Sequence, residues 1–288
     1  MISHVFGNAL TSPLKRLSGG FLHETYLAHT EKESFVLKLI SPSVAARPGA
    51  LENIARAERS AKGFEGVIPL VTAIEQGGKL LFSHGDRFFL VFPFHPGKSV
   101  HPPDITEFHC AKIGEILGLI HGKAVPAPKI STSEEEKRDW RCRLPQEADL
   151  LQKLESRLGA PPGPYVLSHR DLDPKIVLWQ DSIPKVIDWE AAGPVCPEAE
   201  LAEVLNYWAT SPEREKALVR AYTEHCPIRE ECIVPAVDLG FAPLLGWLWY
   251  NTGLGTSTGD KQAELTLGQI KAAVGKREHL VRLLSVYV

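Results

Sequence analysis

The chain has 288 residues, of which 44% are hydrophobic and 23% charged, and its formal net charge is −3. It is long enough to form two compact lobes with their own hydrophobic cores, and its composition is ordinary for a globular protein. The weak negative charge gives no support for nucleic acid as a partner, although it is compatible with a locally acidic pocket for a cationic substrate.

Residues 1–94 predict a small antiparallel sheet with one helix, which we expect to form an N-terminal lobe. Pro48-Gly49 precedes a helical pattern of apolar residues over 51–64. Short β-prone runs separated by turn formers lie at residues 14–17, 24–28, 34–39, 80–82 and 87–92.

Beyond residue 94 the pattern changes from strands to helices. Pro93–Gly97 is the predicted linker, because proline and glycine both stop regular elements. Helices are predicted at residues 105–121, 145–158, 198–208, 212–225, 232–250 and about 265–284, and a hairpin at 177–179 and 185–187. Residues 256–259 are predicted to be a loop, and residues 131–138 an exposed loop or the start of a helix. The fold class expected is therefore α+β, with a larger, mainly helical lobe at residues 95–288.

His169–Ile176, followed by Ile187–Glu190, is the most informative stretch of the chain. Kinases have a His-x-Asp whose Asp meets the acceptor hydroxyl, and an Asn five residues after that Asp that binds a metal ion. On this pattern Asp171 is the catalytic carboxylate, and His169 holds the loop by hydrogen bonds. The position of the Asn is occupied by Ile176, which has neither donor nor acceptor.

Asp188 follows the β-prone run Lys185–Ile187, so its carboxylate is expected at the end of a strand. A hard oxygen ligand of this kind suits Mg²⁺. An Asp that caps a helix beginning at Trp189 explains the residue equally well when it is considered alone. Its spacing from His169 favours the metal ligand.

Lys38 ends the apolar run Phe35–Leu37, where a cation has little use without a charged partner. We expect it to bind the phosphates of a nucleotide, oriented by Glu58 on the following helix or, in reserve, by Glu52. The alternative is a lysine on an edge strand whose stem lies along the surface.

Gly19 and Gly20 follow Ser18 between the first two predicted strands. Glycine lets backbone N–H groups approach phosphates closely, so both residues are candidates for nucleotide binding. A Gly-Gly hairpin turn explains the same residues.

The ends of the chain and its cysteines predict a cytoplasmic protein without a membrane partner. Met1–Gly7 lacks the basic and apolar segments of a secretory signal, and the apolar run Phe241–Tyr250 is too short to span a bilayer. The five cysteines are odd in number and lack Cys-x-x-Cys spacing, so neither a disulfide framework nor a zinc site is indicated.

The motifs at His169–Lys175 and Val186–Glu190 resemble those of the aminoglycoside phosphotransferase and choline kinase-like family, and a looser resemblance extends over residues 14–249. The resemblance implies the two-lobed protein-kinase-like fold, with a nucleotide-binding lobe at residues 1–94 and a catalytic and acceptor-binding lobe at residues 95–288. It also implies Mg²⁺-assisted transfer of a phosphoryl group from ATP or GTP to a hydroxyl of a small molecule, such as an aminoglycoside or an amino alcohol.

The resemblance also assigns roles. By it Asp171 is the catalytic residue, Asp188 a magnesium ligand and Lys38 the phosphate-binding lysine, while backbone groups of Phe92 and Phe94 meet the adenine. The acceptor is expected to be cationic or polyhydroxylated. Candidates for its binding are an aromatic wall, which core packing explains as well, and carboxylates near the catalytic turn: Trp247, Trp249, Tyr250, Glu190, Glu198 and Glu200.

Ile176 departs from the family's pattern, because it removes a ligand of one metal ion. The loss of such a contact in a dry site costs roughly 3 kcal/mol, or about a hundredfold in rate. The sequence therefore predicts either an impaired phosphotransferase or a pseudokinase that binds a nucleotide for a regulatory or structural role. A protein kinase is disfavoured, because the chain has no Asp-Phe-Gly or Ala-Pro-Glu motif.

Overall fold

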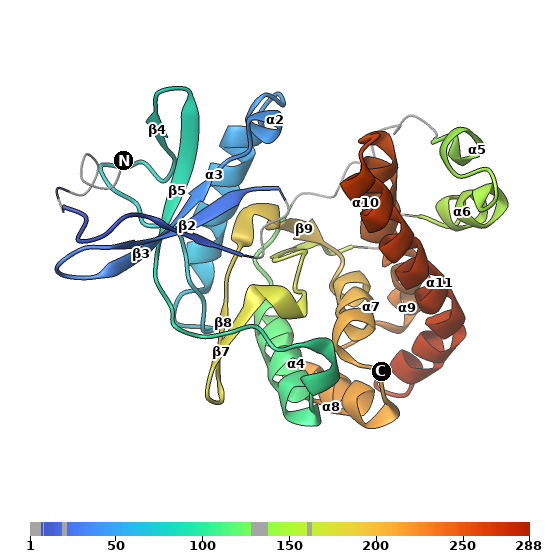
Figure 1. Cartoon of the computed structure of the whole chain (residues 1–288). Helices are drawn as coiled ribbons and strands as arrows, with labels where there is room; N and C mark the ends of the chain where they lie inside the picture. The colour runs from blue at the N-terminus through green and yellow to red at the C-terminus, as the bar shows by residue number, and fades with distance from the viewer. Residues whose placement is uncertain (1–6, 8, 19–21, 128–137, 160–162) are drawn as a thin grey trace. The chain divides into compact units, whose positions relative to one another are not determined.

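The computed structural model of the chain describes residues 7, 9–18, 22–127, 138–159 and 163–288 (Figure 1). It confirms the α+β class, with a small antiparallel sheet and many helices. Contacts divide the chain into two compact units, one of residues 1–104 with 169–193 and one of residues 105–168 with 194–288. Gly19, Gly20 and most of the predicted loop at 131–138 lie outside the described residues, and the lobe boundary after residue 94 stays a prediction.

A five-stranded antiparallel sheet forms the frame of the first unit. Its strands, in the order β1-β2-β3-β5-β4, are β1 (Lys15–Leu17), β2 (Glu24–His29), β3 (Ser34–Leu39), β5 (Arg87–Pro93) and β4 (Phe82–His84). The strand predicted at 80–82 begins at Phe82, because a tight turn through Gly85 (φ 61°) pairs His84 with Arg87 and sets the register of the hairpin. Two helices, α2 (Pro42–Ala45) and α3 (Ala50–Ala61), follow β3, and the short helices η1 (Lys62–Phe64) and η2 (Pro102–Asp104) complete this part.

The two faces of β3 enter two different apolar clusters. Phe35, Leu37 and Leu39 belong to one cluster. The other cluster contains Ile40 and, from α3, Ile54. Because alternate residues of a strand point to opposite faces, Lys38 lies on the same face as Ile40, the face that α3 covers (Figure 1).

The stretch around the predicted catalytic loop belongs to the same unit as the sheet. It contains η3 (Pro174–Ile176), the hairpin β7 (Val177–Gln180) and β8 (Ile183–Val186), and η4 (Trp189–Ala191). The Val71 N–H donates to the Val186 carbonyl (2.9 Å), and the Val186 N–H donates to the Pro69 carbonyl (3.0 Å). The Trp189 ring stacks on Phe64 with 5.6 Å between centroids. These contacts bring the loop to the helix side of the sheet.

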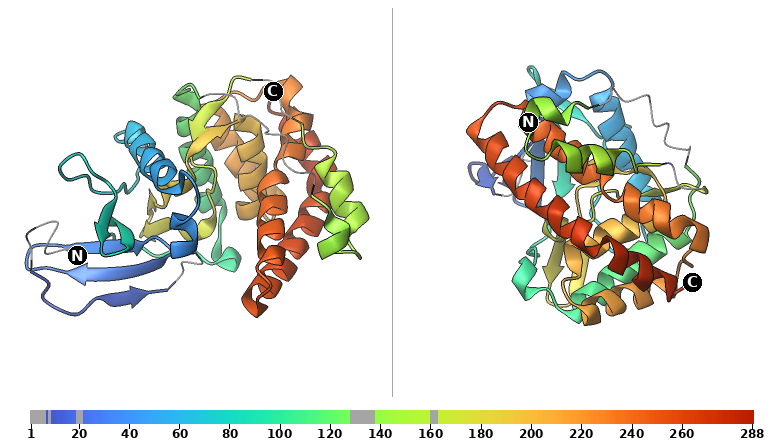
Figure 2. Two further views of the ribbon diagram at one scale, coloured as in Figure 1. Left: turned by 90° about the horizontal axis from the view of Figure 1, so that it is seen from above. Right: turned by 90° about the vertical axis from the view of Figure 1, so that its right-hand side faces the viewer.

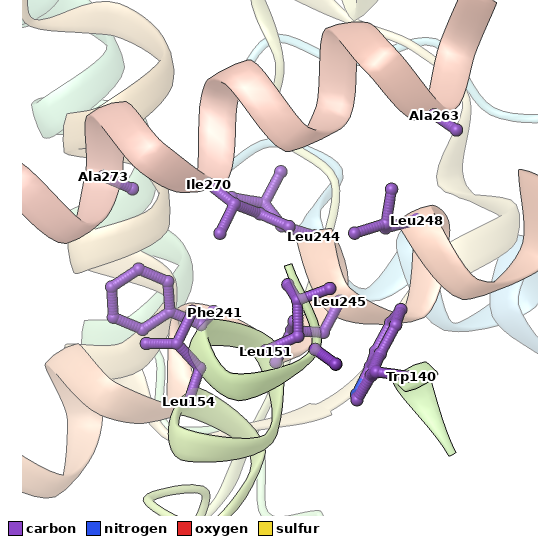
Figure 3. Packing of buried hydrophobic residues seen from close by; sticks show 11 residues of the cluster. Trp140, Leu151, Leu154, Phe241, Leu244, Leu245, Leu248, Ala263, Ile270 and Ala273 are labelled. Atoms are coloured by element: carbon purple, nitrogen blue, oxygen red, sulfur yellow. The ribbon is translucent and has the colours of Figure 1, made fainter. Parts of the chain in front are cut away.

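Helices dominate the second unit, as predicted. They are α4 (Glu107–Gly122), α5 (Trp140–Arg143), α6 (Ala148–Glu155), α7 (Pro197–Trp208), α8 (Pro212–Thr223), η5 (Glu230–Cys232), α9 (Ile233–Leu239), α10 (Ala242–Gly253) and α11 (Ser257–Ser285), with a two-stranded sheet of β6 (Val166–Ser168) and β9 (Gly193–Val195). Helix α10 packs on α11 and α6 (Figure 2). Side chains from these three helices, together with Trp140 of α5, fill a common apolar core (Figure 3).

Two predictions in this unit were wrong. The single helix predicted at 232–250 is two helices, α9 and α10, because Pro243 in the first turn of α10 has no N–H with which to continue the hydrogen bonding of α9. A bidentate ion pair of Asp238 with Arg277 (2.6 and 2.7 Å) holds the end of α9. The loop predicted at 256–259 opens α11, because the Thr256 hydroxyl accepts the Gly259 N–H (3.1 Å) as an N-cap.

Residues 230–253 are long and apolar enough for a membrane span by composition, but 56% of this stretch's most apolar window is buried inside the fold. A core helix has the same composition, so this one candidate is weak evidence for a span.

Helices α4 and α8 pack with their backbones in contact. Gly114, Gly118 and Gly122 lie four residues apart on one face of α4. A Cβ atom at Gly118 would lie 2.6 Å from the Tyr222 carbonyl oxygen, and Cβ atoms at the other two glycines would overlap the carbonyl oxygens of Leu218 and His225. No side chain fits at these positions without moving a helix.

The substitution Gly114→Ala should destabilise the protein by about 2 kcal/mol, because the new methyl group overpacks a contact that backbone atoms already fill. Gly275→Ala is the matched control, since Gly275 lies in α11 with open space around its Cα, and it should be neutral or stabilising by up to about 1 kcal/mol. Urea unfolding followed by circular dichroism measures both. Equal stability of the two variants would contradict the packing described.

Candidate active site

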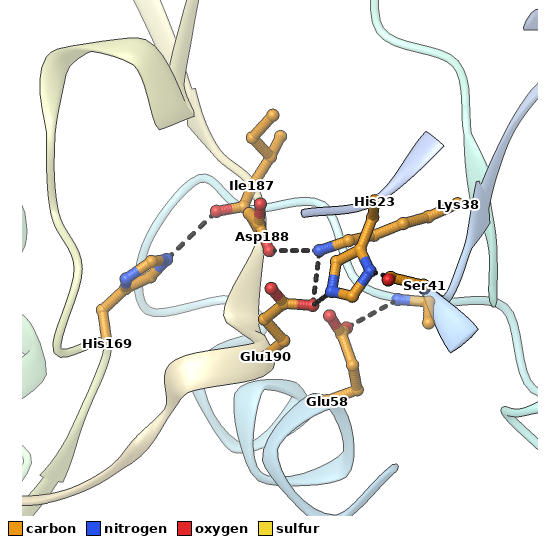
Figure 4. Close-up of polar contacts among 9 residues, drawn as sticks. His23, Lys38, Ser41, Glu58, His169, Ile187, Asp188 and Glu190 are labelled. Carbon is orange, nitrogen blue, oxygen red and sulfur yellow. Dashed lines mark hydrogen bonds and ion pairs between the residues drawn. The ribbon is translucent and has the colours of Figure 1, made fainter. Parts of the chain in front are cut away.

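Lys38 is buried between two carboxylates of the segment after β8 (Figure 4). Its ammonium Nζ lies 2.7 Å from Asp188 Oδ1 and 2.6 Å from Glu190 Oε2. Burial alone lowers the pKa of Lys38, but the charges of the two carboxylates outweigh it and raise that pKa above its ordinary value. Lys38 is therefore a charged group inside the fold, and its stem does not run along the surface.

Asp188 stands at the start of η4, yet its side chain makes no capping hydrogen bond. Its backbone is in the left-handed region (φ 65°, ψ 61°), a conformation that costs a residue with a side chain about 1–3 kcal/mol. The carboxylate is turned to Lys38 instead of to the helix. The geometry thus disfavours the simple capping role that the sequence left open.

Glu190 is the site residue whose place the sequence did not predict. The sequence indicates it only as a group for a cationic acceptor, but two residues after Asp188 the short helix η4 brings it to the same ammonium. Burial alone raises the pKa of Glu190. A hydrogen bond from His23 and the charge of Lys38 outweigh burial and lower this pKa to about 2. The signal in the sequence was an Asp-x-Glu directly after a strand.

Glu58 is completely buried but does not form the expected ion pair with Lys38, which is held by the other two carboxylates. Glu58 Oε2 accepts the Ala73 N–H (3.3 Å), while Oε1 has no hydrogen-bond partner among the described residues. Burial raises the pKa of Glu58 to about 7, partly offset by the Ala73 N–H and the charge of Lys38. Glu52, the reserve partner, is exposed on the same helix.

His169 ties the catalytic loop to the strand that leads to Asp188. Its Nε2–H donates to the Ile187 carbonyl (3.0 Å), and its Nδ1 accepts the Asp171 N–H (3.3 Å). The buried ring also packs on Trp189, with 4.5 Å between centroids. Through these contacts His169 joins the backbone of the loop at Asp171 to the backbone at Ile187.

Asp171 follows Arg170, whose backbone is left-handed (φ 67°). The residue is exposed to solvent, as a group that meets a substrate must be. Loss of hydration where protein atoms crowd its carboxyl raises the pKa of Asp171 to about 7; the charge of Lys175 opposes this shift and that of Asp173 adds to it. A carboxyl group with a pKa near neutrality is suited to accept a proton.

The position of the missing Asn is occupied by a buried hydrocarbon. Ile176 is 6% exposed, and its carbonyl accepts the Ile187 N–H (3.0 Å). Asp173, a possible substitute ligand, is used within the loop, because its Oδ1 accepts the Lys175 N–H (2.9 Å) and its Oδ2 lies 3.5 Å from the Lys175 ammonium.

The predicted adenine-binding backbone lies at the end of β5. The Phe94 N–H donates to the Ser34 carbonyl (3.0 Å), and Phe92 stands opposite Val36 in the ladder. Along an antiparallel ladder every second residue directs its N–H and C=O groups to the same neighbouring strand. Phe92 and Phe94 are two residues apart, so the backbone groups of both face β3. A pocket of about 290 Å³ lies beside this segment, lined by Leu70, Val71, Thr72, Pro93, Phe94, His95 and Lys185. Its lining includes neither Lys38 nor Asp188, so it is separate from the phosphate site predicted around them.

Two of the acceptor-binding carboxylates considered from the sequence are already paired within the second unit. Glu198 is buried and forms an ion pair with Arg229 (2.6 Å), and Glu200 is buried within 2.8 Å of His121 Nε2. Trp249 also has a packing role, because the Arg143 guanidinium lies 3.7 Å from its ring centroid. Trp247 and Tyr250 stack on each other with 5.4 Å between centroids and remain half-buried.

Comparison with known proteins identifies relatives of this architecture. The model of the phosphotransferase enzyme family (APH) matches residues 13–232. Among curated proteins none matches the chain.

Three solved structures are similar to the whole chain at low identity, which shows a shared fold. A spectinomycin phosphotransferase, APH(9)-Ia, in complex with ADP and spectinomycin is 15% identical over 98% of this chain and 95% of that chain, with a TM-score of 0.69. A microcompartment-associated aminopropanol kinase is 16% identical over 97% of each chain, with a TM-score of 0.67. The choline kinase LicA from Streptococcus pneumoniae is 16% identical over 94% of this chain and 96% of that one, with a TM-score of 0.62.

The substitution Glu58→Gln should stabilise the protein at pH 8 and have little effect below pH 5. The pKa of Glu58 is raised to about 7 in the folded state, so the folded protein loses stability relative to the unfolded chain as pH rises from the ordinary range of a glutamate through 7. A shift of this size corresponds to on the order of 3 kcal/mol, which the neutral amide recovers at pH 8.

Urea unfolding at pH 8 and pH 4.8 measures this difference. Glu52→Gln, an exposed change on the same helix, should leave stability unchanged at both pH values. A Glu58→Gln variant that is no more stable than wild type at pH 8 would show that the Glu58 carboxylate is compensated in the folded state.

Proposed function

The chain belongs to the phosphotransferase enzyme family, and on that basis we propose that it transfers the γ-phosphoryl group of ATP or GTP to a hydroxyl of a small molecule, assisted by Mg²⁺. The observation that supports this most is the convergence of Asp188 and Glu190 on the buried ammonium of Lys38. Phosphoryl transfer requires that the reactants are positioned and that the charge of the phosphates is neutralised. A lysine can neutralise phosphate charge, and the carboxylates beside it can hold a metal ion that positions the phosphates.

Asp188 and Glu190 would hold the metal. Their carboxylates supply the oxygen donors that Mg²⁺ prefers. Both already contact one cation, the Lys38 ammonium, so the residues present are suited to bind a cation at this place. When bound, Mg²⁺ would neutralise the charge on the nucleotide phosphates. Lys38 would bind the same phosphates, with Glu58 as the further carboxylate near it, and Gly19 and Gly20 would offer backbone N–H groups.

We assign adenine binding to the end of β5, with one revision. Since Phe92 and Phe94 turn their backbone groups to β3, the groups directed away from β3 are those of Pro93 and His95. The Pro93 carbonyl and the His95 N–H would therefore meet the base, while Phe92 and Phe94 flank these groups in the chain and hold the segment to β3.

Asp171 would orient the acceptor hydroxyl and accept its proton, and His169 would hold the loop that carries Asp171. The acceptor class we propose is a cationic or polyhydroxylated alcohol, such as an aminoglycoside or amino alcohol. This class includes the spectinomycin, aminopropanol and choline named for the structural relatives. We also propose a cytoplasmic location, where ATP, GTP and small-molecule acceptors of this class are available.

A nucleotide-binding pseudokinase is the second candidate, and Ile176 is the observation that favours it. The side chain is buried where the family has a metal-binding Asn, and the nearby Asp173 is engaged within its own loop. A protein of this kind would retain Lys38 and Asp188 for nucleotide binding and would use the nucleotide as a regulatory or structural ligand.

The substitution Ile176→Asn separates the two functions. With saturating ATP or GTP and Mg²⁺, release of the nucleoside diphosphate should report turnover of an amino alcohol or aminoglycoside. Asparagine at this position should raise kcat by up to about a hundredfold, because it restores a charge-stabilising contact.

Asp171→Asn is the negative control and should lower kcat by roughly a hundredfold or more in both backgrounds. Nucleotide binding without any turnover in wild type and in Ile176→Asn would favour the pseudokinase.

A further inference from the structure

A buried histidine just before β2 reaches the segment that we assign to metal binding. His23 is 8% exposed and directly precedes β2. Its Nδ1 accepts the backbone N–H of Ser41 (3.0 Å), and its Nε2 lies 3.2 Å from Glu190 Oε2 (Figure 4). The ring therefore bridges a fixed point of the sheet unit and a carboxylate on η4.

The hydrogen bonds determine which nitrogen carries the proton. A backbone N–H is always a donor, so Nδ1 of His23 is the acceptor in the contact with Ser41 and bears no hydrogen. The proton of the neutral ring is then on Nε2, which donates to Glu190 Oε2. One end of the ring is anchored, and the other end is a donor in a fixed direction.

The same oxygen of Glu190 receives two donors. Oε2 accepts from His23 Nε2 and from Lys38 Nζ (2.6 Å), while Oε1 takes no hydrogen bond from the part of the chain that the structure describes. A glutamate on a short helix has three side-chain torsions, and two donors on one oxygen fix the orientation of the carboxylate. The second oxygen is thereby left in a defined position.

We propose that His23 is a positioning residue, which orients the Glu190 carboxylate for the Mg²⁺–nucleotide complex. This inference rests on the proposed function, because it gives Glu190 the role of a metal ligand. His23 touches neither reactant in this account. It acts through Glu190, and it supplies the donor that keeps Oε2 engaged when Lys38 binds phosphate.

The alternative is that His23 has a structural role only, as the partner of the Ser41 amide at the start of α2. Two substitutions distinguish these roles, because each keeps one hydrogen bond of the His23 ring and removes the other. His23→Gln places an amide N–H near the position of Nε2 and keeps the donor to Glu190. His23→Asn places an amide oxygen near the position of Nδ1 and keeps the acceptor for Ser41.

The experiment is calorimetric titration of Mg²⁺ into protein saturated with ADP, for wild type and both variants. His23→Asn should weaken Mg²⁺ binding by about tenfold, as expected for the loss of a group that orients a metal ligand, whereas His23→Gln should remain within about threefold of wild type. In a Glu190→Gln background the effect of His23→Asn should disappear, because the group through which it acts is gone.

Two controls accompany the titration. His29→Asn changes a histidine at the other end of β2 that contacts Ser34, and it should leave Mg²⁺ binding unchanged. Urea unfolding of each variant tests whether a loss of metal binding reflects a loss of fold.

The outcomes separate this inference from the function on which it rests. Wild type that binds ADP but shows no Mg²⁺ dependence would overturn both. Normal Mg²⁺ binding in wild type, combined with an unaffected His23→Asn or with a weaker His23→Gln than His23→Asn, would overturn the positioning role alone.

Discussion

The charged ammonium of Lys38, held inside the first unit by two carboxylates, is the interaction on which the site depends. A lysine that is 6% exposed needs partners of opposite charge, because desolvation alone would neutralise it. Asp188 and Glu190 supply them from a segment about 150 residues away in the chain. The ion pairs therefore join the sheet to the segment after β8 and mark the place where we propose that a phosphate and a cation bind.

The rest of the unit is arranged so that these three groups meet. The alternation of β3 turns Lys38 to the side covered by α3, and the left-handed backbone of Asp188 turns its carboxylate away from a capping position. His169 then holds the catalytic loop to the same strand through the Ile187 carbonyl. A strained residue, a buried charge and a buried histidine are each unfavourable alone, and together they stabilise one another.

Much of this architecture could be predicted from the sequence, because local patterns carry it. The β3 strand has the predicted bounds, and the spacing of His169, Asp171 and Asp188 indicated both the loop and the strand that precedes Asp188. The partner of Lys38 could not be predicted in this way. Glu58 lies on the expected helix, but it is the ion pairs with Asp188 and Glu190 that the folded chain forms. Long-range pairing of this kind depends on how the segments pack, and the periodicity of the sequence does not indicate it. The contact of His23 with Glu190 could not be predicted for the same reason.

The measurement that tests the central claim most directly is calorimetric titration of ATP, and then GTP, into the wild-type protein with and without Mg²⁺. If Lys38, Asp188 and Glu190 form a nucleotide site, at least one nucleotide will bind with micromolar to millimolar affinity, and Mg²⁺ will strengthen that binding despite Ile176. If neither nucleotide binds in any condition, the cluster is a structural ion-pair network, and only the fold and the family membership of the chain stand.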